Sequence, residues 1–482
     1  MSWLEQLNEP STRRQTLLFL RDSESQNEMM TLLKENEAYF INLLEDEDPK
    51  VRKLCAELMA KSGHKIYRNA ILALYQKEKQ RMILPSLVRS LGYFDLSDIL
   101  ETLEKREKQL QDELDGEMRK HAKEELRMLR QILKPYRELP KHVFTGFKKP
   151  VSMILTIANG HQEALMDELA WLETKKVSLG VQVKTNDFDR LFENHLFSAI
   201  YFPICKTETS DPKDVCSQPV IDKILKFLNQ CHQGDFAYRI RVDHEDPQMA
   251  KKIAEMLEMK SRQLLENHPN DYEIEIRLRT NKSGQGLVYL KLLTIKDERF
   301  SYRKKISASS LAGHTAALIT HYLQDYVQPE GQVIDPLCND GTLLIERCYA
   351  AHPHFVMALD MHHELLDMAK YNANEAGVDI RFVQRDIKSF THRRRFDELL
   401  TKLPAMVRKD EKETVERLYQ KVFDRIPELV GDRGIAAIYT SENKLIQKLY
   451  QRHRQYLELQ DKIGIIGNEC LYIYRVWDPA SH

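Results

Sequence analysis

The sequence lacks the features that mark membrane, secreted or strongly charged proteins. It has no run of about 18 uncharged apolar residues, so we expect no transmembrane helix and no membrane partner. Its first residues do not follow the charged-then-apolar layout of a signal peptide. Lys and Arg number 72 against 73 Asp and Glu, a balance that argues against a basic nucleic-acid coat and against an acidic disordered tail.

Cysteine is scarce, and no two cysteines form a CxxC pair. The seven cysteines are odd in number and widely scattered, at positions 55, 205, 216, 231, 338, 348 and 470. We therefore expect neither a disulfide framework nor a zinc knuckle, and we predict no metal site. A reducing, cytoplasmic location fits this cysteine usage better than an extracellular one.

The residues that are present predict a soluble multidomain chain. A length of 482 residues corresponds to about three domains, and 42% hydrophobic with 30% charged residues is typical of globular proteins. We predict a multidomain α and α/β fold. Its parts are an N-terminal α-helical repeat domain over residues 1–140, an α+β region over 141–298, and a Rossmann-like α/β domain over 299–482.

The first 135 residues or so predict one helix after another, because apolar residues recur at spacings of three and four with little glycine. Segments 43–63 and 80–100 look alike, and each contains a helix that stops near a glycine. The first turn resembles the inter-helix turn of HEAT repeats, and an ordinary helical bundle is the alternative. The residues that carry this resemblance are Asp46, Asp48, Pro49, Val51 and Arg52. Stacked helix pairs would offer a surface to a protein partner.

A charged helix and a basic stretch follow. An apolar stripe over 114–133 (Leu114, Met118, Ala122, Leu126, Leu129 and Leu133) is typical of a docking face. Prolines at 135 and 140 mark a domain boundary. Residues 119–149 hold ten Lys or Arg and three Glu, which indicates either a solvated linker or a strip that follows a phosphate backbone. Lys148 and Lys149 are therefore candidate RNA contacts.

The middle of the chain changes to mixed strand and helix. A strand is predicted over 150–158, a helix over 161–173, and a second helix over 246–267. Two alternating strands place basic side chains on one face, namely Arg239 and Arg241 in 236–242 and Arg277 and Arg279 in 272–279. These arginines are candidate RNA contacts, and a half-solvated sheet face is the alternative interpretation.

The last third alternates strands with helices, the pattern of a parallel sheet covered on both sides. We predict the sheet to end in an antiparallel strand pair. The predicted strands are 332–337, 354–360, 380–386, 396–403, 434–441 and 470–477.

Three of these strands end in an acid, at Asp335, Asp360 and Asp386. Ligands of open α/β sheets bind beyond the carboxyl ends of the strands, where Asp360 is positioned for a ribose diol and Asp386 for an adenine amino group. The first turn carries Asp340, which suits pyrophosphate poorly, and no GxGxxG loop is present. The pattern therefore favours a positively charged sulfonium nucleoside over a nicotinamide dinucleotide, and an oxidoreductase is disfavoured.

The segment VIDPLCNDGTLLIERCYA (333–350) resembles the S-adenosylmethionine motif of class I methyltransferases, in the DPxCGSGT form of THUMP-domain RNA methyltransferases. The matching residues are Asp335, Pro336, Cys338, Gly341, Thr342, Leu344, Ile345 and Glu346. Segments 300–309 and 369–378 resemble other parts of that catalytic domain. Residues 150–170 and 235–285 are similar to THUMP modules with their ferredoxin-like partner.

This resemblance covers roughly residues 143–482 and implies a function. It implies that 299–482 is a class I methyltransferase domain and that 141–298 is a ferredoxin-like plus THUMP region that binds RNA. The implied cofactor is S-adenosylmethionine. The residues implied to bind it are Asp335, Pro336, Cys338, Asn339, Gly341, Thr342, Asp360, Met361, Asp386 and Ile387.

The sequence departs from the family pattern at two places. Asn339 replaces a glycine of the first turn, although asparagine enters left-handed backbone more readily than most residues. The family's (N/D)-P-P-(Y/F) acceptor turn aligns with Lys402-Leu403-Pro404-Ala405. A lysine ammonium only donates hydrogen bonds, and Ala405 offers no stacking face for a base.

Two functions therefore stay open. The first is an S-adenosylmethionine-dependent methyltransferase of tRNA or rRNA whose catalytic positions Lys402, Pro404 and Ala405 form an altered acceptor loop. The second is a catalytically inactive RNA-binding or ribosome-associated protein that keeps the methyltransferase fold.

Overall fold

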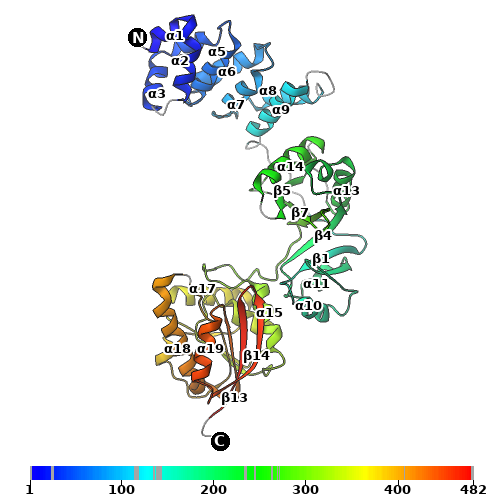
Figure 1. The fold of residues 1–482 in the computed structure, drawn as a ribbon, viewed down its shortest axis with the longest axis vertical. Coiled ribbons are helices and arrows are strands. Elements are labelled where there is room, and N and C mark those ends of the chain that lie inside the picture. The colour runs from blue at the N-terminus through cyan, green and yellow to red at the C-terminus, as the bar shows by residue number, and fades with distance from the viewer. Residues whose placement is uncertain are drawn as a thin grey trace. The chain divides into compact units, whose positions relative to one another are not determined.

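The structure is a computed structural model, and it divides into two compact units, Met1–Leu139 and Pro140–His482 (Figure 1). No helix among the described residues is long and apolar enough to cross a membrane. The described residues are 3–22, 26–112, 119–133, 136, 144–232, 236–243, 246–261, 264–268, 270, 272–406 and 408–478.

The first unit is helical, as predicted. Asp48 caps α5 by accepting a hydrogen bond from the Lys50 backbone N–H at 2.9 Å, and Pro49 occupies the first helical position. Helix α7 stops before Gly92, where an added Cβ would lie 2.5 Å from Ile132 Cγ2. The helices are α1 (Trp3–Asn8), α2 (Pro10–Asp22), α3 (Gln26–Glu35), α4 (Glu37–Leu43), α5 (Pro49–Ala60), α6 (Lys65–Lys77), α7 (Leu84–Leu91), α8 (Leu100–Asp112) and α9 (Arg119–Leu133).

The apolar stripe predicted over 114–133 belongs to the core of this unit. Its described members Ala122, Leu126, Leu129 and Leu133 are buried on α9, which packs against α7 and α8. Leu114 and Met118 lie outside the described residues. Much of the basic stretch 119–149 also lies outside them, and at its end Lys148 and Lys149 are exposed.

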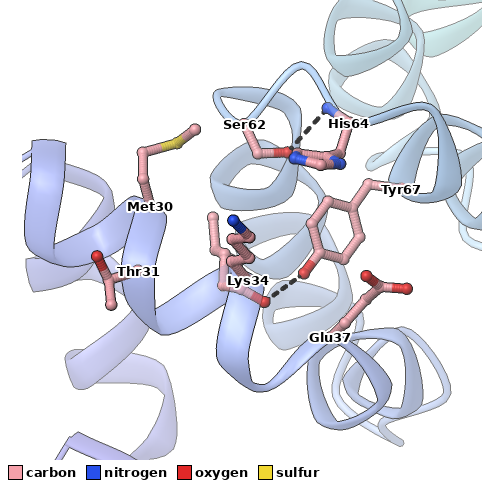
Figure 2. Close-up of a pocket in the computed structure, with 8 residues that line it drawn as sticks. Met30, Thr31, Lys34, Glu37, Ser62, His64 and Tyr67 are labelled. Carbon is pink, nitrogen blue, oxygen red and sulfur yellow. Dashed lines mark hydrogen bonds between the residues drawn. The ribbon is translucent and has the colours of Figure 1, made fainter.

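A small cavity of about 160 Å³ lies among α3, α4 and the start of α6 (Figure 2). Tyr67 closes one side and donates its hydroxyl to the Leu33 carbonyl at 2.7 Å. Its volume is below the roughly 300 Å³ of the smallest typical ligand pockets, so this cavity is a packing gap between helices.

The second unit begins with an eight-stranded mixed sheet in the order β2-β3-β1-β4-β8-β7-β5-β6. Its strands are β1 (Val151–Thr156), β2 (Lys175–Val177), β3 (Gly180–Thr185), β4 (Ala199–Lys206), β5 (Phe236–Val242), β6 (Leu265–Asn267), β7 (Ile274–Thr280) and β8 (Gly286–Leu292). The accompanying helices are α10 (Gln162–Glu168), α11 (Phe188–Leu191), α12 (Pro212–Val215), α13 (Gln218–Leu228) and α14 (Pro247–Lys260).

The helix predicted over 246–267 is confirmed over 247–260 and is wrong at its C-terminal end. Helix α14 ends at Lys260, and Leu265–Asn267 instead forms β6, which pairs in parallel with β5. The strand buries Leu265 completely, so pairing with the sheet edge outweighs the helical pattern of the preceding residues.

The C-terminal sheet has seven strands in the order β11-β10-β9-β12-β13-β15-β14. Its strands are β9 (Gln332–Asp335), β10 (Phe355–Asp360), β11 (Arg381–Gln384), β12 (Phe396–Lys402), β13 (Val430–Thr440), β14 (Leu457–Ile466) and β15 (Glu469–Val476). All six predicted strands are confirmed, and β15 pairs antiparallel with β13 as expected. The sequence analysis missed β14, which pairs antiparallel with β15.

Helices cover both faces of this sheet, which is the doubly wound arrangement predicted. Val333 and Ile334 are neighbours on β9, and they lie in two separate cores. The first core holds residues of α15 (Gly313–Leu323), α16 (Thr342–Ala350) and α17 (His363–Ala376). The second holds residues of α18 (Lys412–Leu429) and α19 (Asn443–Arg452). The fold thereby leaves the carboxyl ends of the parallel strands free to form a site.

Candidate cofactor and RNA sites

Asp335 lies at the point where the strand order reverses, between β9 and β12. It is the last residue of β9 and only 2% exposed. Its Oδ1 accepts hydrogen bonds from the Thr401 hydroxyl at 2.6 Å and from the Leu337 backbone N–H at 2.9 Å. Doubly wound sheets bind ligands at such a reversal, so Asp335 fixes the wall of a candidate site.

Burial raises the pKa of Asp335 to about 7. The hydrogen bonds from Thr401 and Leu337 oppose the shift, and the negative charge of Asp360 adds to it. Because the pKa of this acid is higher in the folded state than in the unfolded chain, its contribution to stability falls as the pH rises from about 4 to about 7.

Asp335→Asn is therefore expected to change how stability depends on pH. Asparagine keeps the shape and does not titrate, so the variant should gain stability relative to the wild type between pH 5 and pH 8. Each pKa unit is worth about 1.4 kcal/mol, and we expect a relative gain of at least about that size. Urea unfolding followed at both pH values measures it. An equal destabilisation at pH 5 and pH 8 would contradict the raised pKa.

The turn after β9 holds two residues in left-handed backbone. Asn339 has a φ of 50° and Gly341 a φ of 79°. The Cys338 backbone N–H donates to the Leu359 carbonyl at 2.9 Å, which ties the turn to β10. Asn339 thus adopts the conformation that the family's glycine would favour, at a cost of about 1–2 kcal/mol for an ordinary residue.

Asp360 is the last residue of β10, and its carboxylate connects the end of that strand to the turn after β9. It is 5% exposed, and its Oδ2 accepts the Asn339 backbone N–H at 3.3 Å while Oδ1 accepts that of His362 at 3.0 Å. The next residue, Met361, is 54% exposed. Asp335 and Asp360 therefore both border the turn of Asn339, as the strand-end pattern predicted.

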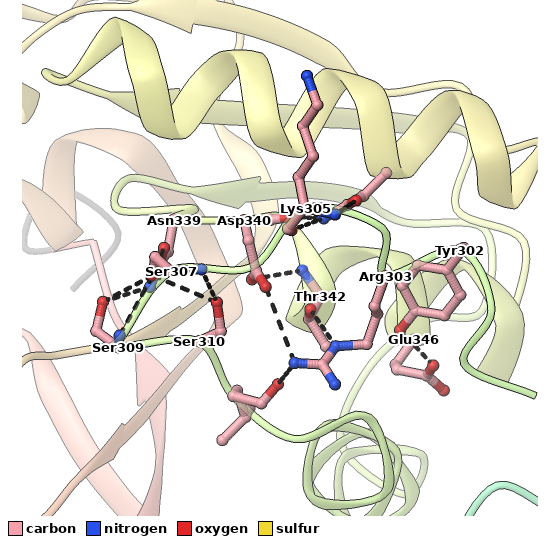
Figure 3. A network of polar contacts seen from close by, with 12 residues as sticks. Tyr302, Arg303, Lys305, Ser307, Ser309, Ser310, Asn339, Asp340, Thr342 and Glu346 are labelled. Carbon is pink, nitrogen blue, oxygen red and sulfur yellow. Dashed lines mark hydrogen bonds and ion pairs between the residues drawn. The ribbon is translucent and has the colours of Figure 1, made fainter. Parts of the chain in front are cut away.

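A serine-rich segment is bound to this turn (Figure 3). The Asn339 Oδ1 accepts from the Ser307 hydroxyl, and its Nδ2 donates to the Ser309 Oγ, both at 2.8 Å. The Lys402 ammonium donates to the Ser309 carbonyl at 2.9 Å. Burial lowers the pKa of Lys402, against the attraction of Glu469 and Asp340. The side chains of Asn339 and Lys402 thus hold the same serine.

Asp340 lies inside the turn with one oxygen unused. Its Oδ1 accepts the Thr342 backbone N–H at 3.3 Å, and Thr342 is the first residue of α16. Among the described side chains, its buried Oδ2 has no hydrogen-bond partner, and the nearest cation is Arg303, with 4.0 Å between the two atoms. Arg303 itself donates from Nε to the Thr342 hydroxyl at 3.1 Å. The interior of the turn is therefore acidic.

Asp386 follows β11 and caps the short helix η4 (Ile387–Ser389). Its Oδ1 accepts the Lys388 backbone N–H at 2.8 Å, and its Oδ2 pairs with the Lys421 ammonium at 2.7 Å. Partial burial, which would raise the pKa of Asp386, is outweighed by Lys421 and Lys388, so this pKa is lowered. Ile387 is buried. The predicted adenine contact thus starts from a carboxylate that is already paired.

The aligned acceptor turn is rigidly attached at three points. The Leu403 backbone N–H donates to the Tyr439 carbonyl at 2.9 Å, and the Pro404 carbonyl accepts from the Tyr419 hydroxyl at 2.8 Å. The backbone N–H of Met406 donates to the Glu442 carboxylate at 2.9 Å. Ala405 is exposed between these anchors. The turn therefore has a defined shape without an aromatic side chain at its tip.

Three of the four predicted arginines line one cavity of about 660 Å³ beside β5, β7 and α14. They are Arg239, Arg241 and Arg277. Arg241 pairs with Glu275 at 3.1 Å, and Arg277 stacks on the Tyr201 ring, 5.3 Å from its centroid. The fourth, Arg279, pairs with Asp243 at 3.1 Å. The cavity has the size of a ligand pocket, and its wall carries four basic side chains, the three arginines and Lys251, against two acidic ones, Asp243 and Asp246.

Sequence reasoning missed several residues that shape the candidate cofactor site. Thr401, Ser307 and Ser309 contact Asp335 or Asn339 from segments 30 to 66 residues away. The serines lie within the segment 300–309, which carried part of the family resemblance. The resemblance of that segment to the catalytic domain was the sequence signal that it belongs to the site. Its sequence does not indicate that a serine contacts Asn339.

Together, the reversal point and the helices on both faces define a Rossmann-like α/β domain. Residues 302–467 match the family model described as RMKL-like, methyltransferase domain (UPF0020).

Among particular relatives, the chain is 24% identical over 215 residues to the "Putative RNA methyltransferase YpsC" of Bacillus subtilis (strain 168). That match covers 36% of this chain and 54% of the relative, so the chain spans about half the length of that curated protein.

Two solved structures share the fold. TrmN from Thermus thermophilus has a TM-score of 0.50 at 17% identity and covers 67% of this chain and 99% of its own. SMU.472, "a putative methyltransferase complexed with SAH", has a TM-score of 0.52 at 17% identity and covers 69% and 99%. At this identity the likeness shows the fold alone, and its extent exceeds the 302–467 match.

Proposed function

We propose that the chain is an S-adenosylmethionine-dependent RNA methyltransferase. The observation that carries this proposal is the pair of buried carboxylates, Asp335 and Asp360, on either side of the left-handed turn at Asn339. The match of residues 302–467 to a methyltransferase domain supports it, as does the SAH bound in SMU.472.

The residues present suit a cationic nucleoside. Asp360 uses one lone pair on each oxygen for a backbone N–H, which leaves others for a ribose diol. The Asp340 carboxylate gives the turn negative charge, and Asp335 adds to it as it ionises around its pKa of about 7. A sulfonium would be attracted to this charge. When bound, S-adenosylmethionine supplies an electrophilic methyl group. The further contacts proposed for it are Pro336, Cys338, Gly341, Thr342, Met361, Asp386 and Ile387.

The role of the protein at the acceptor is positioning. Because the methyl donor is already a strong electrophile, holding the acceptor in line contributes more than proton removal. Lys402, Pro404 and Ala405 form the wall where the acceptor would lie, and the anchors at Leu403, Pro404 and Met406 keep that wall rigid.

The middle region would hold the RNA. We propose a division into a HEAT-like repeat domain (1–140), a ferredoxin-like and THUMP region (141–298) and the methyltransferase domain (299–482). The arginine-lined cavity supports an RNA platform, because guanidinium groups bind phosphates in bidentate geometry and stack on bases. The Lys148 and Lys149 side chains are exposed and would extend this platform.

The experiment that tests the proposal is transfer of a tritiated methyl group from S-adenosylmethionine to total tRNA and total rRNA by the purified full chain. We expect incorporation into one of the two pools. Incorporation into neither, with cofactor binding intact, would favour the second function, an inactive RNA-binding or ribosome-associated protein.

The second function is favoured by Lys402 and Ala405, which replace an acceptor group and an aromatic ring. If the altered turn limits catalysis, the double variant Lys402→Asn with Ala405→Tyr should increase methyl incorporation at least tenfold over the wild type. The added ring supplies about 1–3 kcal/mol of base stacking. Ala405→Tyr alone separates stacking from hydrogen bonding. A double variant with less activity than the wild type would mean that Lys402 takes part in the natural reaction.

A further inference from the structure

A second cavity lies directly beyond the acceptor turn. Its volume is about 470 Å³, within the range of small-molecule pockets. It is walled by Met406 of the loop after β12, by the start of α18, and by residues 441–448, which comprise the link after β13 and the first part of α19. It therefore opens at the same edge of the sheet as Asp335 and Asp360, on the side of β13.

The wall of this cavity is cationic. Lys444 and Lys448 lie one turn apart on α19, and both are exposed. No carboxylate of the described residues lies within 4.0 Å of either ammonium. The third lysine, Lys412, has only a long contact of 3.9 Å with Glu416. The carboxylate of Glu442 is occupied by the Met406 backbone N–H. The cavity wall thus carries three lysines and two glutamates, a formal excess of one positive charge.

Two apolar side chains also line the cavity. Leu445 of α19 is buried, Met406 is half-buried, and both line the cavity. A thioether and an aliphatic side chain provide a flat, adaptable surface for an aromatic ring. A cavity lined by two apolar side chains and three lysines suits a nucleotide, which combines an apolar base face with a phosphate.

We infer that this cavity binds one nucleotide of a single-stranded RNA segment, next to the nucleotide held at the acceptor turn. The base would lie on Met406 and Leu445, and the phosphate between Lys444 and Lys448. Because Ala405 supplies no stacking ring, the neighbouring nucleotide would anchor the strand instead. The inference rests on the proposed function for its substrate class, and it adds a subsite that lies outside the cofactor turn.

The test uses the full chain and a fluorescein-labelled twelve-nucleotide single-stranded RNA that contains 4-thiouridine. Fluorescence anisotropy gives the Kd between 50 and 200 mM salt. Lys444→Gln with Lys448→Gln should raise the Kd about five- to twentyfold and make the slope of log K against log salt shallower by roughly 0.7–1.4, because one or two phosphate contacts are lost. Irradiation of the wild type should cross-link the RNA to residues 403–416 or 441–448.

The matched control is Lys370→Gln with Arg454→Gln, which removes two exposed charges elsewhere in the same domain, one on α17 and one in the turn after α19, and should change the Kd less than twofold. All of the replaced side chains are exposed, and unchanged melting temperatures verify folding. The inference would be overturned if the two pairs of substitutions changed the Kd equally, or if the cross-links were confined to residues 141–298. It would also be overturned if polyglutamate competed for the protein as well as unlabelled RNA does. SAH binding is measured in parallel. Its absence would refute the cofactor proposal, while the cross-link still decides this one.

Discussion

Asp360→Ala is expected to weaken binding of S-adenosylhomocysteine by roughly 100-fold. Asp360 is buried at the end of β10, and two hydrogen bonds from a ribose diol to its carboxylate would each be worth about 1.5 kcal/mol or more. A total of about 3 kcal/mol corresponds to about two powers of ten in Kd. Isothermal titration calorimetry of the full chain measures the change.

Two further variants make this result specific. Asp360 also accepts the backbone N–H groups of Asn339 and His362, so alanine leaves both without an acceptor. Asp360→Asn keeps an acceptor oxygen and the shape, and should weaken binding by about tenfold. Asp367→Ala removes an exposed carboxylate of α17 and should leave the Kd unchanged. Equal Kd values for wild type and Asp360→Ala would rule out a ribose contact at this residue.

Arg347→Met is expected to destabilise the methyltransferase domain by about 3–5 kcal/mol. Arg347 on α16 pairs with Glu398 on β12 at 2.9 Å, and each side chain is only 2% exposed. Arg347 also donates to the Gln328 carbonyl at 3.1 Å. Removing one partner of a buried pair leaves an uncompensated charge, and that penalty dominates the effect.

Thermal unfolding followed by circular dichroism checks this expectation. At about 2–4 °C per kcal/mol, the melting transition of the domain should fall by about 6–20 °C. The double variant Arg347→Met with Glu398→Leu removes both charges and should recover most of the loss. Arg417→Met breaks an exposed pair with Glu413 and should have little effect. A melting temperature within 2 °C of the wild type for Arg347→Met would contradict the buried-pair argument.

The sequence predicted the architecture of the C-terminal domain well because buried parallel strands read as short apolar runs. The strands that end at Asp335 and Asp360 are confirmed in place and in order. Strand β14 was not predicted because its residues are mostly exposed at the sheet edge and it carries Glu458, Asp461 and Lys462. Edge strands tolerate such charges, so they lack the apolar run of a central strand.

Local patterns failed where long-range pairing decided the structure. Residues 265–267 continue a helical pattern, yet they add a strand to β5, a partner about 30 residues earlier. The same reason explains the missed serines. Ser307 and Ser309 bind Asn339 across more than 29 residues, and no local spacing reports such a contact. The roles assigned to the individual cofactor residues stay predictions.

Lys402 illustrates what the structure adds to a motif comparison. From the sequence alone, a lysine at this position indicates that the hydrogen-bond acceptor of the aligned turn is lost. In the fold, the ammonium is held by the carbonyl of Ser309, and burial lowers its pKa. Lys402 and Asn339 depart from the family pattern at separate places in the sequence, and both contact the same serine. The two departures are therefore structurally connected.

Equilibrium titration of the purified full chain with S-adenosylhomocysteine tests the cofactor site most directly. We predict binding of one molecule per chain with a Kd in the micromolar range, and loss of that binding in Asp360→Ala. An absence of heat, and of any thermal stabilisation, at millimolar ligand would contradict the proposal that Asp335, Asp360 and the turn of Asn339 form a nucleoside site.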